Sequence, residues 1–279
     1  MSNDALDSLA KTDVPGKLYD DLVHPTAQSI GKTASFIPRT IGVWLGRWEC
    51  WIANGEESIK RTIEAAGEKA RAIPEEHLVE PPAYVAVPAI QQLAYSYDSE
   101  DLREMYANLL VSSMDDRTSE YVHPSFVQIL KEMSPDEARL ISSIARGMAE
   151  DPELAIPLID LRVVPTGPML PLRWRDLVRG YNVCCEGVCE RPDQSLVYLG
   201  NLERLGVIES SDSYPEDLAS KFEDLESREP IAKAKVEANL PEGWKFDVRH
   251  WTYCVTNYGR NFIKTCTGVG AERSNPGEA

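Results

Sequence analysis

The spacing of apolar residues changes near residue 150, and this change constrains the fold more than any other feature of the chain. Between residues 98 and 150 apolar side chains recur three or four positions apart, which is the spacing of helices with one buried face. After residue 150, the segments 155–164 and 245–256 have the pattern of strands. We therefore predict a mainly α (α+β) fold, in which a helical N-terminal arm and a helical body precede a winged-helix-like C-terminal module.

Local signals place several helix ends. Ser134, Pro135 and Glu137 form a capping box with proline at the first helical position, so a helix is predicted to begin there. In the C-terminal module, Asp193 is expected to cap a helix that Gly206 ends. The order of helix, short strand, charged insert, strand and closing helix is typical of a winged-helix unit, and the insert is expected to be a solvated wing or hairpin.

An apolar series in the N-terminal part of the chain contains three tryptophans. Its steps alternate between four and three, which is the heptad spacing of a helix seam, although Pro38 should kink or restart the helix. The members are Ile30, Ala34, Ile37, Ile41, Trp44, Trp48 and Trp51. Packing or self-association through this face is favoured, and Trp44, Trp48, Trp51 and Arg47 are the predicted interaction residues. Contact with a membrane interface and an aromatic ligand platform are the alternatives.

Composition shifts and proline positions divide the chain into segments. We predict an acidic leader at 1–25, an amphipathic helical arm at 26–73, a helical body at 74–150, a winged-helix-like module at 151–267 with its charged insert at 210–243, and a disordered tail at 268–279. The four prolines between 74 and 88 predict an extended connector at the start of the body rather than a helix.

The acidic balance argues against a broad nucleic-acid surface. The chain has 29 basic and 45 acidic residues, a net charge of −16, and such a surface repels phosphate backbones. If the winged-helix-like module does read DNA, Arg249, Arg260 and Lys264 are the candidate contacts. A contact with protein is favoured over one with DNA, because the helix at 193–206 offers a single arginine.

Catalytic chemistry has little support in the sequence. No phosphate-binding loop, dinucleotide fingerprint or metalloprotease motif is present. His123 is interpreted as a residue near a helix start and Asn108 as a buried amide that hydrogen-bonds nearby backbone. The cysteines at 184–189 lack the paired spacing of a zinc site. We predict a non-enzymatic protein with no catalytic residues, no metal and no cofactor. Without a signal peptide or a transmembrane stretch, it is expected in the cytoplasm.

Ordered blocks along most of the chain carry a family resemblance. They read IPEEHLVEPPAYVAVPAIQQL, DLREMYANLLVSSMD, VHPSFVQILKEMSPDEARLI, YLGNLERLGVIE and VTNYGRNFIKTC, and they fall within residues 19–267. Together they resemble the Abi-alpha (abortive infection alpha) family of bacterial domains. The resemblance implies a mainly helical, intracellular phage-defence protein and carries no catalytic residue across. We expect such a protein to act through self-association or a protein partner, with a DNA-binding regulator and a membrane-surface effector as the alternatives.

Overall fold

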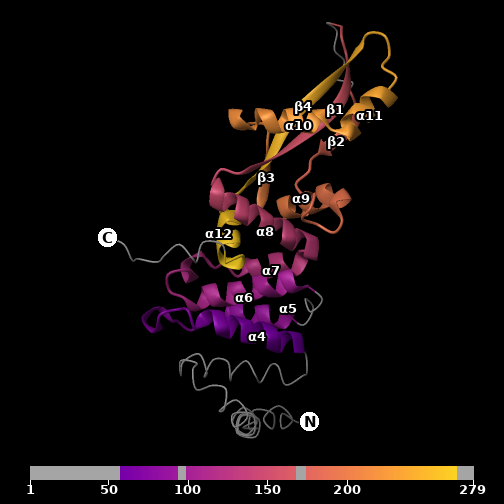
Figure 1. Ribbon diagram of the computed structural model, residues 1–279. Helices are drawn as coiled ribbons and strands as arrows, with labels where there is room; N and C mark the ends of the chain where they lie inside the picture. The colour runs from indigo at the N-terminus through magenta and orange to yellow at the C-terminus, as the bar shows by residue number, and fades with distance from the viewer. Residues whose placement is uncertain (1–56, 94–98, 168–173, 269–279) are drawn as a thin grey trace, which may run out of the picture. The chain divides into compact units, whose positions relative to one another are not determined.

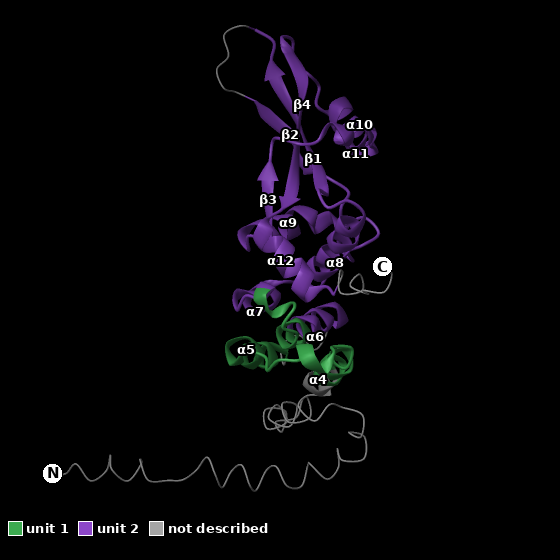
Figure 2. Cartoon of the chain, turned by 90° about the vertical axis from the view of Figure 1, so that its left-hand side faces the viewer, with its two compact units in different colours: residues 1–97, 110–120 green, residues 98–109, 121–279 purple. Residues whose placement is uncertain are grey.

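The computed structural model describes residues 57–93, 99–167 and 174–268, and they belong to two compact units. Unit 1 takes residues 1–97 and 110–120, and unit 2 takes residues 98–109 and 121–279 (Figure 2). Helix α6 (Glu100–Met114) therefore begins in unit 2 and ends in unit 1. No helix in the described part of the chain is long and apolar enough to cross a membrane.

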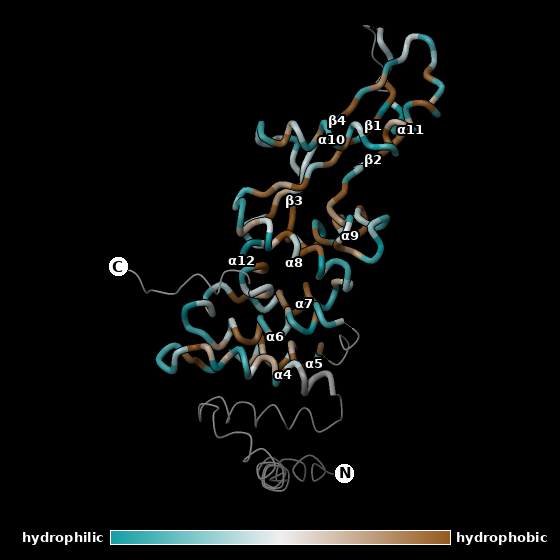
Figure 3. The backbone as a smooth tube through the Cα atoms, in the orientation of Figure 1, coloured by the Kyte–Doolittle hydropathy of each residue, from teal (hydrophilic) through white to brown (hydrophobic). Residues whose placement is uncertain are grey.

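Unit 1 is helical. It contains α4 (Glu57–Ala70), the short 3-10 helix η2 (Glu75–His77), α5 (Ala83–Leu93) and the last turn of α6. Hydrophilic and hydrophobic residues alternate along α4, as expected of a helix with one buried face (Figure 3). After α6 the chain returns beside η2, where the Val79 amide donates to the Met114 carbonyl at 2.8 Å and the Asp116 amide to the His77 carbonyl at 3.0 Å.

The predicted extended connector at the start of the body is wrong, because α5 occupies its second half with Pro88 inside the helix. The Pro82 carbonyl accepts hydrogen bonds from the amides of Val85 and Ala86, so Pro82 lies at the start of α5, where a missing amide hydrogen is tolerated. Pro88 removes one helical hydrogen bond, but both Val85 and Ile90 are buried, at 0% and 3% exposure. The free energy gained by burying these apolar side chains of α5 outweighs the loss of one helical hydrogen bond at Pro88.

The helices of unit 2 agree well with the sequence. They are α7 (Ser125–Glu132), α8 (Pro135–Glu150), α9 (Ser195–Arg204) and α12 (Asn257–Cys266). The capping box is confirmed, since the Glu137 amide donates to the Ser134 hydroxyl and the Ser134 amide to the Glu137 carboxylate. Gly206 follows α9 with a φ of +74°, as a helix-ending glycine does. Asp193 is not the cap of α9, because Gln194 holds that position and makes no side-chain cap bond.

A four-stranded antiparallel sheet completes unit 2 (Figure 1). Its strands are β1 (Ala155–Pro165), β2 (Arg175–Tyr181), β3 (Ile208–Ser211) and β4 (Trp244–Val255), in the order β2-β1-β4-β3. β1 and β4 pair without interruption from Ala155 opposite Cys254 to Pro165 opposite Trp244. The predicted strands and the mainly helical α+β class are confirmed, whereas β2 was not predicted.

The charged insert is helical, so the expectation of a wing or hairpin there is wrong. It forms α10 (Ala219–Ser227) and α11 (Glu229–Glu237). Their apolar side chains, with Leu218 just before them, join a core cluster with β1: Leu218, Phe222, Leu225 and Ile231 pack with Ala155, Ile159 and Leu161. The many charges lie on the outer faces of the two helices, while each buried apolar side chain contributes about 1.5–3 kcal/mol. This burial holds α10 and α11 on the sheet.

Candidate functional site

The predicted interaction residues Trp44, Trp48, Trp51 and Arg47 lie outside the described residues. Their place on a helix face stays a prediction.

The three candidate nucleic-acid contacts all lie in unit 2 and all have partners within it. Arg249 on β4 donates to Asp212 at 2.5 Å and lies 3.6 Å from Asp160. Arg260 and Lys264 lie one turn apart on α12, away from Arg249 in sequence. A role for any of them in binding phosphate requires an exchange of these partners, and that role stays a prediction.

The two cations of α12 are held by nearby groups. The Arg260 guanidinium donates to the Pro152 carbonyl at 2.6 Å and lies 3.5 Å from the Glu153 carboxylate. The Lys264 ammonium lies 3.5 Å from the centre of the Tyr121 ring, a cation–π contact. Both contacts tie α12 to the body of unit 2.

His123 lies at a helix start and Asn108 hydrogen-bonds backbone, as the sequence indicated. The His123 Nδ1 atom accepts the Ser125 amide at 3.2 Å, beside the first residue of α7, and also contacts the Ser125 hydroxyl. That hydroxyl in turn hydrogen-bonds Tyr258. Asn108 donates to the Cys266 carbonyl at 3.0 Å, which satisfies its buried amide and joins α6 to the end of α12.

Among the described residues of unit 2, the Asp136 carboxylate accepts the most hydrogen bonds, and the sequence indicated only a helix-start residue there. It is 7% exposed and accepts the amides of Glu190 and Arg191 at 2.8 and 3.0 Å. It also accepts the Tyr198 hydroxyl at 2.8 Å and the Arg139 guanidinium. Burial raises the pKa of Asp136, but these hydrogen bonds outweigh burial and hold its pKa below the usual range. The arrangement fixes the loop before α9.

The cysteines at 184–189 line that loop as thiols. The Cys184 and Cys185 sulfurs lie 3.8 Å apart, and the Cys184 thiol donates to Asn182 at 3.0 Å. Contact with Cys184, followed by burial, raises the pKa of the Cys185 thiol. Burial, followed by contact with Cys185, raises the pKa of Cys189 to about 12. Among the described residues, no group of histidine, cysteine and acidic side chains is arranged to hold a metal ion.

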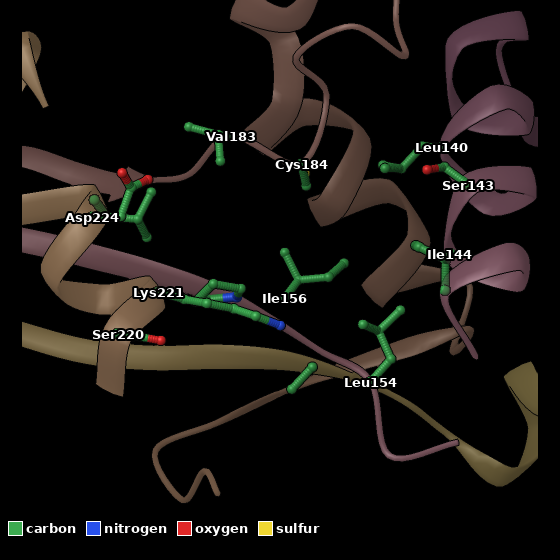
Figure 4. Close-up of a pocket in the computed structure, with 14 residues that line it drawn as sticks. Leu140, Ser143, Ile144, Leu154, Ile156, Val183, Cys184, Ser220, Lys221 and Asp224 are labelled. Atoms are coloured by element: carbon green, nitrogen blue, oxygen red, sulfur yellow. The ribbon is translucent and has the colours of Figure 1, made fainter. Parts of the chain in front are cut away.

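A cavity of about 510 Å³ opens between the helices and the sheet of unit 2 (Figure 4). Four segments that are distant in sequence build its wall. They are Leu140, Ser143, Ile144 and Gly147 of α8; Leu154, Ala155, Ile156 and Pro157 at β1; Val183 and Cys184 of the cysteine loop; and Ser220, Lys221, Asp224 and Leu225 of α10. Its volume is within the range of small-ligand sites. No sequence signal pointed to it.

A second, polar hollow of about 300 Å³ lies on the exposed side of β3 and β4. Glu203 accepts the Ser210 hydroxyl at 2.8 Å and the Tyr253 hydroxyl at 3.0 Å. Burial and the Glu203 charge raise the pKa of Tyr253 to about 12. Trp251 packs against Tyr253 and donates to Asp160. The polar groups here satisfy one another, so the apolar cavity is the better candidate for a ligand.

The fold and the site define a mainly helical α+β protein with an apolar cavity beside its sheet. The chain belongs to the abortive infection alpha family, whose model matches residues 54–266, and the resemblance seen in the sequence is confirmed. No curated protein matches the chain. A solved structure of an uncharacterized protein from the hydrocarbon-degrading marine bacterium Alcanivorax borkumensis SK2 is similar at 23% identity and a TM-score of 0.33, over 55% of this chain and 96% of that one.

Proposed function

We propose that this protein is a non-enzymatic component of bacterial phage defence that acts by binding protein, first of all a second copy of itself. Membership of the abortive infection alpha family supports the defence role. The outward face of α9 supports protein binding and carries the proposal. Leu196 and Val197 are 42% and 63% exposed there, whereas a DNA-reading helix would present cations. The one arginine of α9, Arg204, is already paired with Glu132 at 2.6 Å.

The proposed surface for self-association is the tryptophan series of the N-terminal arm, because its heptad spacing predicts Trp44, Trp48 and Trp51 on one helix face. Size-exclusion chromatography with light scattering on the wild type and on the triple alanine variant tests this. We expect an oligomer that the triple substitution converts to a monomer. A wild-type monomer, or an oligomer that the substitution leaves intact, contradicts self-association through this face. Binding of the monomeric wild type to lipid vesicles would instead favour the membrane-surface alternative.

The α9 face is tested with a matched pair of substitutions. Val197→Glu places a charge on that face, and Val236→Glu places the same charge on α11, where the valine is 84% exposed. We expect Val197→Glu alone to abolish protection of a bacterial host against phage, measured as plaque counts. Equal protection by both variants contradicts a role for the face.

The absence of catalysis is tested in the same host. The His123→Ala, Ser125→Ala double variant removes a hydroxyl and an imidazole that lie in contact at the start of α7. If the protein acts by binding alone, this variant keeps its protection as long as it folds. Loss of protection in a variant with an unchanged melting temperature would indicate a reaction at this pair.

A winged-helix DNA-binding regulator is the second candidate, and the strand order favours it. β1, β4 and β3 are neighbours in the sheet, with α8 before β1 and α9 before β3, and this order supports the candidate. In this chain α10 and α11 stand between β3 and β4, where a wing was expected. It predicts salt-sensitive binding that weakens when Arg249, Arg260 and Lys264 are neutralised. A gel-shift assay at low salt with no retarded band removes this candidate.

A further inference from the structure

The cavity of unit 2 has an apolar floor and a polar mouth. Leu140, Ile144 and Ile156 are 1%, 4% and 8% exposed and form the floor, together with Leu225 of α10. Ser220, Lys221 and Asp224 lie on α10 at the open side, where all three are exposed. The floor therefore favours the apolar body of a ligand, and the mouth favours its polar end.

Lys221 supplies the positive charge at the mouth. The acidic residue beside it, Asp224, accepts both Nε and Nη2 of Arg228 at 3.1 Å, and Arg228 also reaches Glu186 at 3.0 Å. Arg228 thus binds two carboxylates, and the ion pair of Asp224 is with Arg228 rather than with Lys221. Lys221 is the only cation among the lining residues, and its ammonium makes no ion pair with any residue of the described chain.

The direction of the Lys221 side chain fits a role inside the cavity. It extends from α10 along the cavity toward Leu154 and Ile156 (Figure 4). The Ser143 hydroxyl is on the side of α8 that faces the cavity, and it makes no hydrogen bond with another described residue. An unpaired ammonium and an unpaired hydroxyl above an apolar floor leave one cation and one neutral donor for a ligand.

We propose that this cavity binds a small amphipathic anion, with its apolar body against Ile144 and Ile156 and its anionic end at Lys221. A single ammonium balances one negative charge, so a carboxylate or sulfonate on an apolar body fits, and a nucleoside triphosphate does not. Such a ligand has two sources, a free metabolite and a membrane lipid of one negative charge. The site is independent of the protein contacts proposed above.

The probe is 8-anilinonaphthalene-1-sulfonate, which joins a sulfonate to an apolar body, and its neutral analogue is 1-anilinonaphthalene. Both are titrated into the full-length protein by fluorescence. We expect saturable binding of the sulfonate and a higher melting temperature with it, because a ligand of the folded state stabilises that state. No saturable binding, or a lower melting temperature, overturns the proposal, since the latter indicates binding to unfolded chain.

Two lysine variants separate the site from general charge. Lys221→Met keeps the length of the side chain and removes its charge, and Lys245→Met does the same on β4, outside the cavity. We expect Lys221→Met to weaken sulfonate binding about two- to fivefold, the effect of one lost ion pair at an exposed ammonium, and to leave binding of the neutral analogue unchanged. Equal losses in the two variants overturn the proposal.

A filling variant and a vesicle assay complete the test. Leu154→Trp enlarges a half-buried side chain of the wall and is expected to block both probes, whereas full binding of both in a folded variant overturns the site. Co-sedimentation with phosphatidylglycerol vesicles distinguishes the sources. If the wild type binds vesicles and Lys221→Met does not, the ligand is a lipid. If the wild type binds no vesicles, the ligand is a free anion. If Lys221→Met changes neither vesicle binding nor sulfonate binding, the role of Lys221 is overturned.

Discussion

Replacing Asp136 by alanine is expected to lower the free energy of unfolding by about 3–5 kcal/mol, the cost of removing one partner from a buried charged network. The substitution leaves two backbone amides, of Glu190 and Arg191, and the Tyr198 hydroxyl without their acceptor. Arg139 loses less, because it keeps Asp101 at 3.2 Å and Glu190 at 2.8 Å. The three orphaned donors, at about 1–3 kcal/mol each and partly rehydrated, account for the expected range.

The assay is urea denaturation followed by circular dichroism at pH 7, with two controls. Tyr198→Phe removes one of the donors and is expected to cost about 1 kcal/mol. Asp193→Ala removes an exposed carboxylate of the same loop, whose contact with Arg191 is 3.6 Å long, and is expected to change stability by less than about 0.5 kcal/mol. If Asp136→Ala costs no more than Asp193→Ala, the network does not hold the loop.

The same variant has a pH dependence of known sign. The pKa of Asp136 is depressed in the folded protein, so its ionised form stabilises the fold above the pKa of an unfolded aspartate, about 3.9. This contribution is lost as the pH falls through the folded pKa. The gap in stability between wild type and Asp136→Ala should therefore narrow from pH 7 towards pH 3, and a gap that widens contradicts the assigned shift.

Two further predictions concern close packing. A Cβ at Gly259 would lie 2.0 Å from the Val207 carbonyl oxygen, so Gly259→Ala should lower the free energy of unfolding by about 3 kcal/mol. A Cβ at Gly200 meets nothing within 4 Å, so Gly200→Ala should raise the free energy of unfolding by up to about 1 kcal/mol. A urea midpoint that is higher for Gly259→Ala than for Gly200→Ala contradicts this prediction. Cys185 and Cys266 are 1% and 0% exposed, and burial raises the pKa of Cys266 to about 12. Iodoacetamide at pH 8 should label both only after urea is added, as read by mass spectrometry, and labelling of the native protein at the rate of the half-buried thiols refutes their protection.

Features governed by local hydrogen bonding were predictable from the sequence. The capping box at Ser134 and the positive φ at Gly206 each depend on residues within one helical turn. The alternation of 245–256 likewise predicts β4, because one face of this strand packs on the core. In each case the side chains that decide the structure are neighbours in the sequence.

The predictions for the charged insert, for α5 and for the cap of α9 were wrong for physical reasons. Leu218, Phe222 and Leu225 are spaced four and three apart, so the helical signal of the insert was present, but its high charge was taken as evidence for a solvated wing. Pro88 was taken to exclude a helix, and burial of α5 outweighed it. The helix of 193–206 was placed correctly while its cap was not, because Asp193 lies inside a 3-10 helix, η4 (Pro192–Gln194), that leads into α9.

The candidate cavity lay beyond any single-sequence argument. Its wall combines α8, the start of β1, the cysteine loop and α10, and no local pattern states which of these faces meet. The register of β1 on β4, with Ala155 opposite Cys254, and the packing of Phe222 on that sheet bring the segments together. The tryptophan series, which the sequence made most prominent, lies outside the described residues, and its role rests on the proposed experiments.

The interleaving of the two units has a consequence for how the chain is made and cut. Unit 1 needs the segment 110–120, where the Met114 carbonyl and the Asp116 amide bond residues near 78, yet residues 98–109 between its two parts belong to unit 2. Translation must therefore pass residue 120 before both segments of unit 1 are present, and a gene fragment that stops at residue 97 lacks the second of them. Neither unit can be exchanged with another protein as one uninterrupted stretch, so recombination should preserve or lose the pair together.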